Sequence, residues 1–122
     1  YNANPSSMAD ALDAFDRSTP QNIARFYILG AMDELGTTAP AQHEAIGNLL
    51  KLRPKDRAAF VGSKELTKAY ASAISPQQYI CTESVEKIKS TIAQFEGAIF
   101  LKGSRNYSLE KLLPSTNLNL NH

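Results

Sequence analysis

The segment Ala24–Gly36, ARFYILGAMDELG, carries the pattern that decides the fold. In an extended chain, Phe26 and Ile28 face one side. Tyr27 and Leu29 face the other side. Because both faces are apolar, the pattern predicts a central strand that helices cover on both sides.

The loop after this strand is the first place where we expect chemistry. Ligands of open α/β sheets bind beyond the carboxyl ends of the strands, and residues 30–36 occupy that position here. Asp33 and Glu34 are adjacent within the loop and suit a substrate amine or Mg²⁺. A pair of surface carboxylates on a tight strand-to-helix connection explains the same residues at least as well.

Composition limits the possible functions. The chain has 122 residues, 43% of them hydrophobic, which suits one core and one domain. Its net charge of +1 argues against nucleic-acid binding and against a membrane-surface patch. The single cysteine and the lack of an apolar run near the roughly 18 residues of a membrane span favour a cytoplasmic protein. Since the chain opens on a tyrosine within a motif, we expect it to be a piece of a longer protein.

Elsewhere in the chain, helical and strand patterns alternate. Asn4 and Pro5 suit the N-cap and the first turn of the first helix, and Leu12 and Ile92 lie in apolar stripes that we expect in the core. The order predicts an α/β fold in which helices flank a mostly parallel sheet. The expected helices lie within 1–16, over 39–53, from 63, from about 82 and over 109–113, and the expected strands over 24–30, 57–62, 78–81 and 98–102.

Two of these helices have well-marked apolar faces. In the second, the expected face consists of Ile46, Leu49 and Leu50, and Pro54 is expected to end the helix. The helix from about residue 82 has the clearest stripe, which consists of Val85, Ile88, Ile92 and Phe95.

Polar residues follow the last predicted strand in the sequence KGSR. Gly103 permits close backbone approach, so Lys102, Ser104 and Arg105 are candidates to hold a phosphate or a carboxylate. A solvated rim of lysine and arginine is an equally good explanation.

Other reactive side chains carry weaker signals. His43 lies one turn before an apolar residue, which favours a buried, hydrogen-bonded role over metal binding. Cys81 ends an apolar strand, which favours a buried and inert thiol. The sequence has no GxxxxGK[ST] loop, so this chain cannot by itself hold ATP in the manner of a P-loop.

Three stretches together resemble a known family: YNANPSSM at the start, LGAMDELG with His43 and Gly47 after it, and FLKGSR near the end. They are similar to the carboxy-terminal domain of the Mur ligases, over residues 1–114. The resemblance implies a Rossmann-like three-layer domain, the last of three in the enzyme. The first would hold a UDP-sugar peptide, and the missing central one would hold ATP and Mg²⁺ and pack against this domain.

Within the family, the motifs are most similar to members that join D-Ala-D-Ala to UDP-N-acetylmuramoyl-tripeptide through an acyl phosphate, in peptidoglycan precursor synthesis. The resemblance then implies which residues face which ligand. Those on the nucleotide side are Tyr1, Asn2 and Asn4. Glu34 would border the dipeptide pocket. Those near the phosphate or the dipeptide carboxylate are Lys102, Ser104 and Arg105.

Two departures from the family pattern affect these assignments. The family usually has an aspartate just before the position of Tyr1, which this chain lacks, and Ala31 stands where many members have an aspartate. The alternative function is a free-standing α/β regulatory or ligand-binding module such as a phospho-acceptor receiver. A receiver needs acidic residues at its strand ends, and the predicted ends carry Gly30, Gly62 and Lys102 instead. Residues 115–122 are expected to form a disordered tail.

Overall fold

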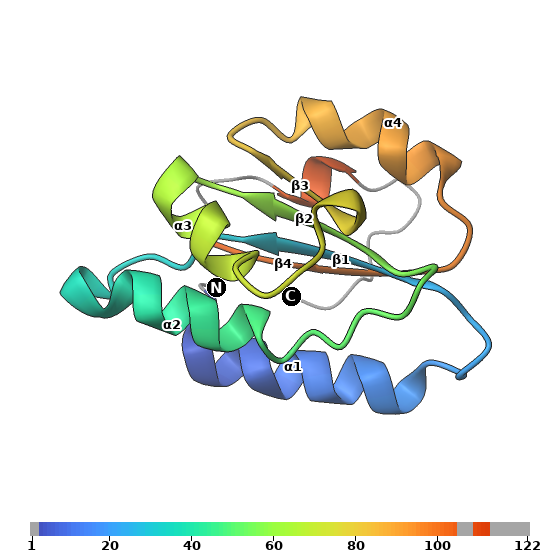
Figure 1. Cartoon of the computed structure of the whole chain (residues 1–122), viewed down its shortest axis with the longest axis horizontal. Coiled ribbons are helices and arrows are strands. Elements are labelled where there is room, and N and C mark those ends of the chain that lie inside the picture. Colours follow the sequence, from blue (N-terminus) through green and yellow to red (C-terminus); the bar gives the residue numbers. More distant parts are fainter. Residues whose placement is uncertain (1–2, 105–108, 113–122) are drawn as a thin grey trace.

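The computed structural model describes residues 3–104 and 109–112 and contains one four-stranded sheet (Figure 1). Neighbouring strands all pair in parallel, in the order β3-β2-β1-β4. The predicted central strand is therefore confirmed, because β1 lies between two partners. The strands are β1 (Arg25–Gly30), β2 (Arg57–Val61), β3 (Tyr79–Thr82) and β4 (Ala98–Lys102).

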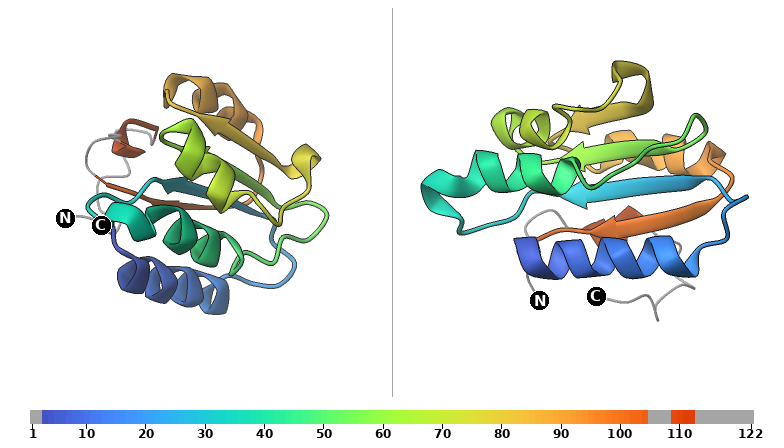
Figure 2. Two further views of the ribbon diagram at one scale, coloured as in Figure 1. Left: turned by 60° about the vertical axis from the view of Figure 1, so that its left-hand side comes forward. Right: turned by 60° about the horizontal axis from the view of Figure 1, so that its bottom comes forward.

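Helices cover both faces of this sheet, as the alternating pattern predicted (Figures 1 and 2). One face packs on the first three helices through a core that includes Tyr27 and Leu29. The other packs on the fourth helix and a short 3₁₀ helix through a core that includes Phe26 and Ile28. The helices are α1 (Pro5–Ser18), α2 (Ala39–Gly47), α3 (Lys64–Tyr70) and α4 (Glu86–Gln94), with 3₁₀ helices at Gly36–Thr38, Pro76–Gln78 and Leu109–Leu112.

The first helix begins where the sequence predicted. The Asn4 side chain accepts a hydrogen bond from the Ser7 N–H at 2.9 Å, and the Ser7 hydroxyl accepts one from the Asn4 N–H at 3.1 Å. This reciprocal pair satisfies backbone donors that the first turn leaves without helical partners. Leu12 is buried in the core as expected, whereas Ile92 is only partly buried against the core of the opposite face.

The second helix is shorter than predicted and ends at Gly47. A Cβ atom on Gly47 would lie 1.8 Å from the carbonyl oxygen of Tyr70, so α2 and α3 touch through their backbones there. Beyond that contact the chain turns away, which leaves Leu49 47% exposed while Leu50 stays buried. Placing Leu49 on the buried face was therefore wrong, as was Pro54 as the helix end, because tertiary packing overrides the local pattern.

Two further predictions are corrected near the edge strand β3. The fourth helix begins at Glu86 rather than near Thr82, because the Thr82 hydroxyl accepts a hydrogen bond from the Ser84 N–H at 3.0 Å and forms a local turn. Cys81 is exposed rather than buried. Partial burial of its sulfur nevertheless raises the pKa of the thiol, which donates to the Thr67 carbonyl oxygen, so the thiol stays protonated at neutral pH.

Candidate functional site at the carboxyl edge of the sheet

Two loops meet beyond the carboxyl ends of β1 and β4. A Cβ atom on Gly103 would lie 2.7 Å from the Cα atom of Gly30, so the turn after β4 packs directly on the end of β1. Only glycine permits this approach at residue 103. The part of the predicted KGSR stretch that the structure describes, residues 102–104, and the loop after the central strand are thus brought together.

Ser104 is the most informative residue of this junction. It is 3% exposed, and among the residues that the structure describes its hydroxyl has no hydrogen-bond partner. A buried polar group in that state costs about 1–3 kcal/mol relative to a paired one. Such a group calls for an explanation, and a bound ligand provides one.

The other predicted site residues lie in varied settings. Glu34 is exposed and has a φ angle of 62°, a backbone conformation that non-glycine residues seldom adopt. Lys102 is half-buried at the end of β4, and Asp33 is half-buried in the loop. Ala31 is 1% exposed, and its N–H donates to the Val61 carbonyl oxygen at 2.8 Å, so it lies inside the sheet edge rather than on the surface of the loop.

Of the residues that the resemblance places on the nucleotide side, the structure describes Asn4. The amide oxygen of Asn4 is used as the helix cap, although the residue itself is exposed. Tyr1, Asn2 and Arg105 lie outside the described residues, as does the predicted tail over 115–122. Within 3–104 and 109–112, no three His, Cys, Asp or Glu residues are grouped to hold a metal ion.

His43 has the buried, hydrogen-bonded role that the sequence predicted. Its ring is 0% exposed, and its Nε2 accepts a hydrogen bond from the Met32 N–H at 2.9 Å. Burial lowers the pKa of the imidazole, an effect only partly opposed by the hydrogen bond to the Ala39 carbonyl oxygen. His43 therefore supports the loop after β1 from beneath as a neutral ring.

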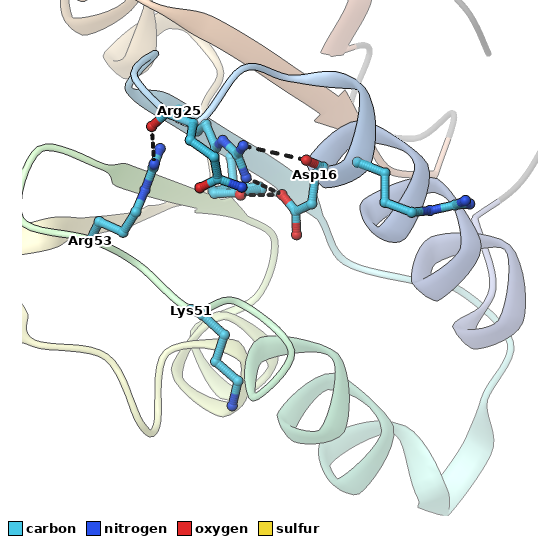
Figure 3. A pocket seen from close by; sticks show the side chains of 7 residues that line it. Asp16, Arg25, Lys51 and Arg53 are labelled. Carbon is cyan, nitrogen blue, oxygen red and sulfur yellow. Dashed lines mark hydrogen bonds and ion pairs between the residues drawn. The ribbon is translucent and has the colours of Figure 1, made fainter.

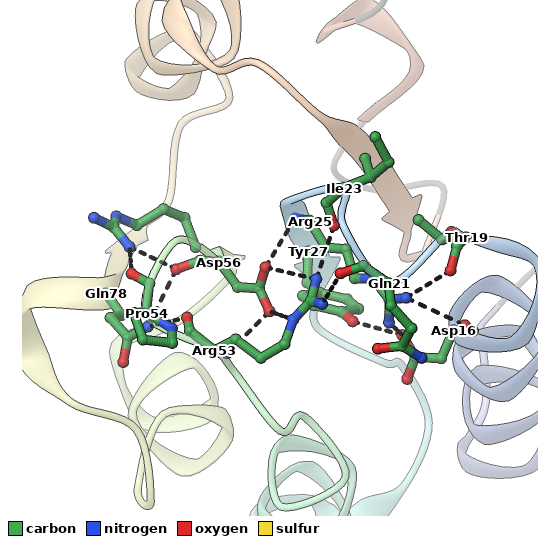
Figure 4. A network of polar contacts seen from close by, with 11 residues as sticks. Asp16, Thr19, Gln21, Ile23, Arg25, Tyr27, Arg53, Pro54, Asp56 and Gln78 are labelled. Carbon is green, nitrogen blue, oxygen red and sulfur yellow. Dashed lines mark hydrogen bonds and ion pairs between the residues drawn. The ribbon is translucent and has the colours of Figure 1, made fainter.

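The opposite, amino edge of the sheet holds a polar network that sequence reasoning missed (Figure 4). Asp56 is 1% exposed and accepts hydrogen bonds from the backbone N–H groups of Arg25 and Arg53, both at 2.9 Å. The Arg25 guanidinium pairs with Asp16 at 3.0 Å, and the same carboxylate accepts the Tyr27 hydroxyl. Burial and the bond to Asp16 raise the pKa of Tyr27 to about 12, so its hydroxyl remains a donor.

A hollow of about 630 Å³ opens beside this network between α1 and the strand ends (Figure 3). The Arg25 guanidinium bonds to the Thr19 carbonyl oxygen as well as to Asp16. The Arg53 guanidinium bonds to Asp56 and to the carbonyl oxygens of Gln21 and Ile23. Because these donors are turned toward the protein's own oxygens, we interpret the network as structural. In the sequence, the signal for this network is the presence of charged residues at the amino ends of two apolar strands.

The fold defines a class: an α/β domain with an all-parallel sheet, in which ligands generally bind where the strands end. The sequence identifies the family. Residues 1–105 match the family described as Mur ligase, glutamate ligase domain, and the chain belongs to that family.

Individual relatives agree with this assignment. The chain is 29% identical over 120 residues to the UDP-N-acetylmuramoyl-tripeptide–D-alanyl-D-alanine ligase of Treponema pallidum, covering 93% of this chain and 26% of that protein. It is similar to the crystal structure of MurF ligase from Thermotoga maritima in complex with ADP, with a TM-score of 0.71 and 26% identity. It is also similar to a crystal structure of MurF from Acinetobacter baumannii, with a TM-score of 0.69 and 25% identity. Each alignment covers 92% of this chain and 25% of the solved one.

The chain thus spans about a quarter of the length of these relatives. The similarity confirms the predicted Mur ligase resemblance and the α/β fold. In the part of the chain that the structure describes, none of the helices has the length and apolar character needed to cross a membrane.

Proposed function

We propose that this chain is the carboxy-terminal domain of an ATP-dependent ligase that joins D-Ala-D-Ala to UDP-N-acetylmuramoyl-tripeptide. The observation that carries the proposal is the similarity to a ligase with that name over 93% of this chain. Similarity to a MurF ligase solved with ADP supports the use of ATP. The proposed location is the cytoplasm, where ATP is available.

The reaction we assign to the complete enzyme has two steps. ATP transfers its γ-phosphoryl group to the terminal carboxylate of the tripeptide, which yields ADP and an acyl phosphate. The amine of D-Ala-D-Ala then attacks the acyl carbon, a C–N bond forms, and the C–O bond to phosphate breaks. The leaving phosphate takes the electron pair, and the amine loses a proton to solvent or to a base.

Holding ATP and Mg²⁺ is assigned to another domain of the complete enzyme. The residues of this chain do not fit that task, because the sequence has no phosphate-cradling loop and the described residues contain no group of metal-binding side chains. Bound Mg²⁺ would neutralise the phosphate charge during transfer. This domain instead places the incoming dipeptide and, by packing against the central domain, excludes water from the acyl phosphate.

The proposed dipeptide site lies at the carboxyl edge of the sheet. Lys102, Ser104 and Arg105 are assigned to an anion, either the dipeptide carboxylate or the phosphate, and the unpartnered Ser104 hydroxyl supports this role. Glu34 is assigned to the border of the dipeptide pocket. The residues assigned to the nucleotide side are Tyr1, Asn2 and Asn4.

The test is an assay of the complete protein for ADP release. Release over many turnovers should require both D-Ala-D-Ala and UDP-N-acetylmuramoyl-tripeptide, and the 122-residue chain alone should release none. Release over many turnovers that is independent of either substrate would contradict the proposed function. Release by the purified short chain would contradict the division between domains.

A further inference from the structure

Two fully buried side chains hold the turn that follows the central strand. The Tyr70 hydroxyl donates to the carbonyl oxygen of Gly30 at 2.7 Å, and the Met32 N–H donates to Nε2 of His43 at 2.9 Å. Tyr70 comes from α3 and His43 from α2, and each is 0% exposed. The turn over residues 30–32 is therefore bonded at both ends to helices that follow it in the sequence.

The geometry fixes one protonation form of His43. Nδ1 lies 2.7 Å from the carbonyl oxygen of Ala39, which can only accept a hydrogen bond, so Nδ1 carries the proton. Nε2 is then free of a proton and accepts from Met32. The two rings meet edge to face at 4.7 Å, and Phe60 stacks on Tyr70 at 5.0 Å, so packing restricts both rings.

The same contacts extend to the candidate site. A side chain on Gly47 would strike the Tyr70 carbonyl, so the close approach of α2 and α3 brings the two rings together. The turn after β4 in its turn packs on Gly30 at Gly103. A shift of the Gly30 backbone would therefore move the surface against which Ser104 is placed.

We propose that His43 and Tyr70 are positioning residues that hold the turn over 30–32 so that the Glu34 loop and the Lys102–Ser104 turn face the same dipeptide. This role rests on the proposed function. The two side chains act through the backbone and do not touch substrate themselves.

Protonation of His43 would break this arrangement. An added proton on Nε2 would oppose the Met32 N–H, and burial already lowers the pKa of the ring from its ordinary value of 6.5. Tyr70 is the titratable group that packs on the ring, and its hydroxyl is directed to Gly30. Among the described residues, no charged side chain contributes to this pKa shift. Neutral His43 is thus the working form at and above pH 6.5.

The first experiment uses matched tyrosine variants of the complete ligase. Tyr70→Phe removes the hydroxyl that holds Gly30 and keeps the ring. We expect kcat/KM for D-Ala-D-Ala to fall about 5- to 30-fold, mainly through KM, with KM for ATP unchanged. The control, Tyr27→Phe, removes a hydroxyl from the amino edge of the same sheet and should change neither constant more than about twofold. Equal effects of the two variants would overturn the proposal.

The second experiment asks for rescue by a residue that keeps the acceptor. The amide oxygen of glutamine in His43→Gln can occupy the place of Nε2, whereas His43→Leu has no acceptor. We expect His43→Gln to retain most of the kcat/KM for D-Ala-D-Ala. We also expect this kcat/KM to fall less steeply below pH 6.5 in His43→Gln than in the parent. Similar losses in both variants, with identical pH profiles for parent and His43→Gln, would overturn the proposal.

A spectroscopic readout separates this inference from the proposed function. Nitrogen chemical shifts of the His43 ring in the 122-residue chain should report a proton on Nδ1 at pH 7, whatever the enzyme's substrate. A proton on Nε2 would overturn the hydrogen-bond assignment. A complete protein without dipeptide-dependent activity would instead overturn the proposed function, and with it the role in placing the dipeptide.

Discussion

The two ends of the sheet differ in how many of their polar groups are paired within the protein. At the amino edge, Asp56 is almost fully buried and its two oxygens accept from Arg25 and Arg53 (Figure 4). The Nε of Arg25 has no partner among the described residues, but its other two guanidinium nitrogens bond to oxygens of Asp16 and Thr19. At the carboxyl edge, glycines bring two turns together and the single hydroxyl of Ser104 is left unpaired within the described chain.

This difference shows how one sheet can serve stability and binding separately. Polar groups that bond within the protein stabilise the fold and have little capacity left for a ligand. A buried group without a partner costs stability and gains a partner only when a ligand arrives. Changes at the amino edge should therefore alter unfolding, and changes at the carboxyl edge should alter catalysis.

The largest effect is expected from Asp56→Ala. Removal of this carboxylate leaves the backbone N–H groups of Arg25 and Arg53 without their acceptor. Each unsatisfied buried donor costs about 1–3 kcal/mol, so the free energy of unfolding should fall by about 2–6 kcal/mol. Denaturant unfolding of the 122-residue chain measures the change. Leu49→Ala, at an exposed position, is the control and should stay within about 0.5 kcal/mol. A parental unfolding midpoint for Asp56→Ala would mean that the network does not stabilise the fold.

The next effect is on activity and comes from Arg105→Ala in the complete ligase. A charged hydrogen bond to an anionic group is worth about 1.5–3 kcal/mol, so kcat/KM should fall roughly 10- to 150-fold. Arg105→Lys should recover part of this, because it keeps the charge and loses the planar fork. Steady-state kinetics with each substrate varied will tell whether the dipeptide or ATP is affected. Parental constants for Arg105→Ala would identify a solvated rim residue.

Ser104→Ala gives the sharpest contrast between the two edges. The variant removes a buried hydroxyl that has no partner among the described residues, so the free energy of unfolding should stay the same or rise slightly. Activity of the complete ligase should fall by about 5- to 10-fold if the hydroxyl binds substrate, since a neutral hydrogen bond is worth about 1 kcal/mol. Lower stability together with unchanged kinetics would place Ser104 with the structural residues instead.

His43 and Asp56, which lie at opposite edges of the sheet, should lose their contributions to stability in different pH ranges. The pKa of His43 is lowered from 6.5, so the folded chain binds fewer protons there and loses stability as the pH falls below 6.5. Burial opposes the charge of Asp56, but hydrogen bonds from Arg53 and Arg25 together lower its pKa below 3.8, and its contribution is lost as the pH falls further through that lowered value. In plots of unfolding free energy against pH, His43→Gln should lose the decline below pH 6.5, and Asp56→Asn should lose the decline at lower pH. Curves parallel to the parent would contradict the assignment.

The smallest effect is expected at the exposed ion pair between Arg17 and Asp13. The two side chains are 75% and 66% exposed and pair at 3.0 Å within α1. Solvent screening limits such pairs, so Arg17→Ala should change the free energy of unfolding by less than about 0.5 kcal/mol. Although Arg17 lines the hollow of the amino edge, it takes no part in the buried network. A loss comparable to that of Asp56→Ala would show that Arg17 belongs to the stabilising network.

The sequence alone determined the features that depend on neighbouring residues. Apolar residues on both faces of the extended segment predicted β1, and the run AIFLK predicted the bounds of β4. The N-cap at Asn4 could be predicted because its partner Ser7 lies three positions away. The three family motifs likewise identified the Mur ligase family, which the comparison over residues 1–105 confirmed.

Tertiary structure alone decided the features that depend on distant pairs. Gly47 lies against the carbonyl group of Tyr70, where a side chain would clash, and no local pattern contains that contact. Asp56 bonds to the N–H of Arg25 across 31 positions, and His43 reaches back to Met32 across 11. Period and propensity describe one segment at a time, whereas burial and hydrogen-bond partners depend on which segments the fold brings together.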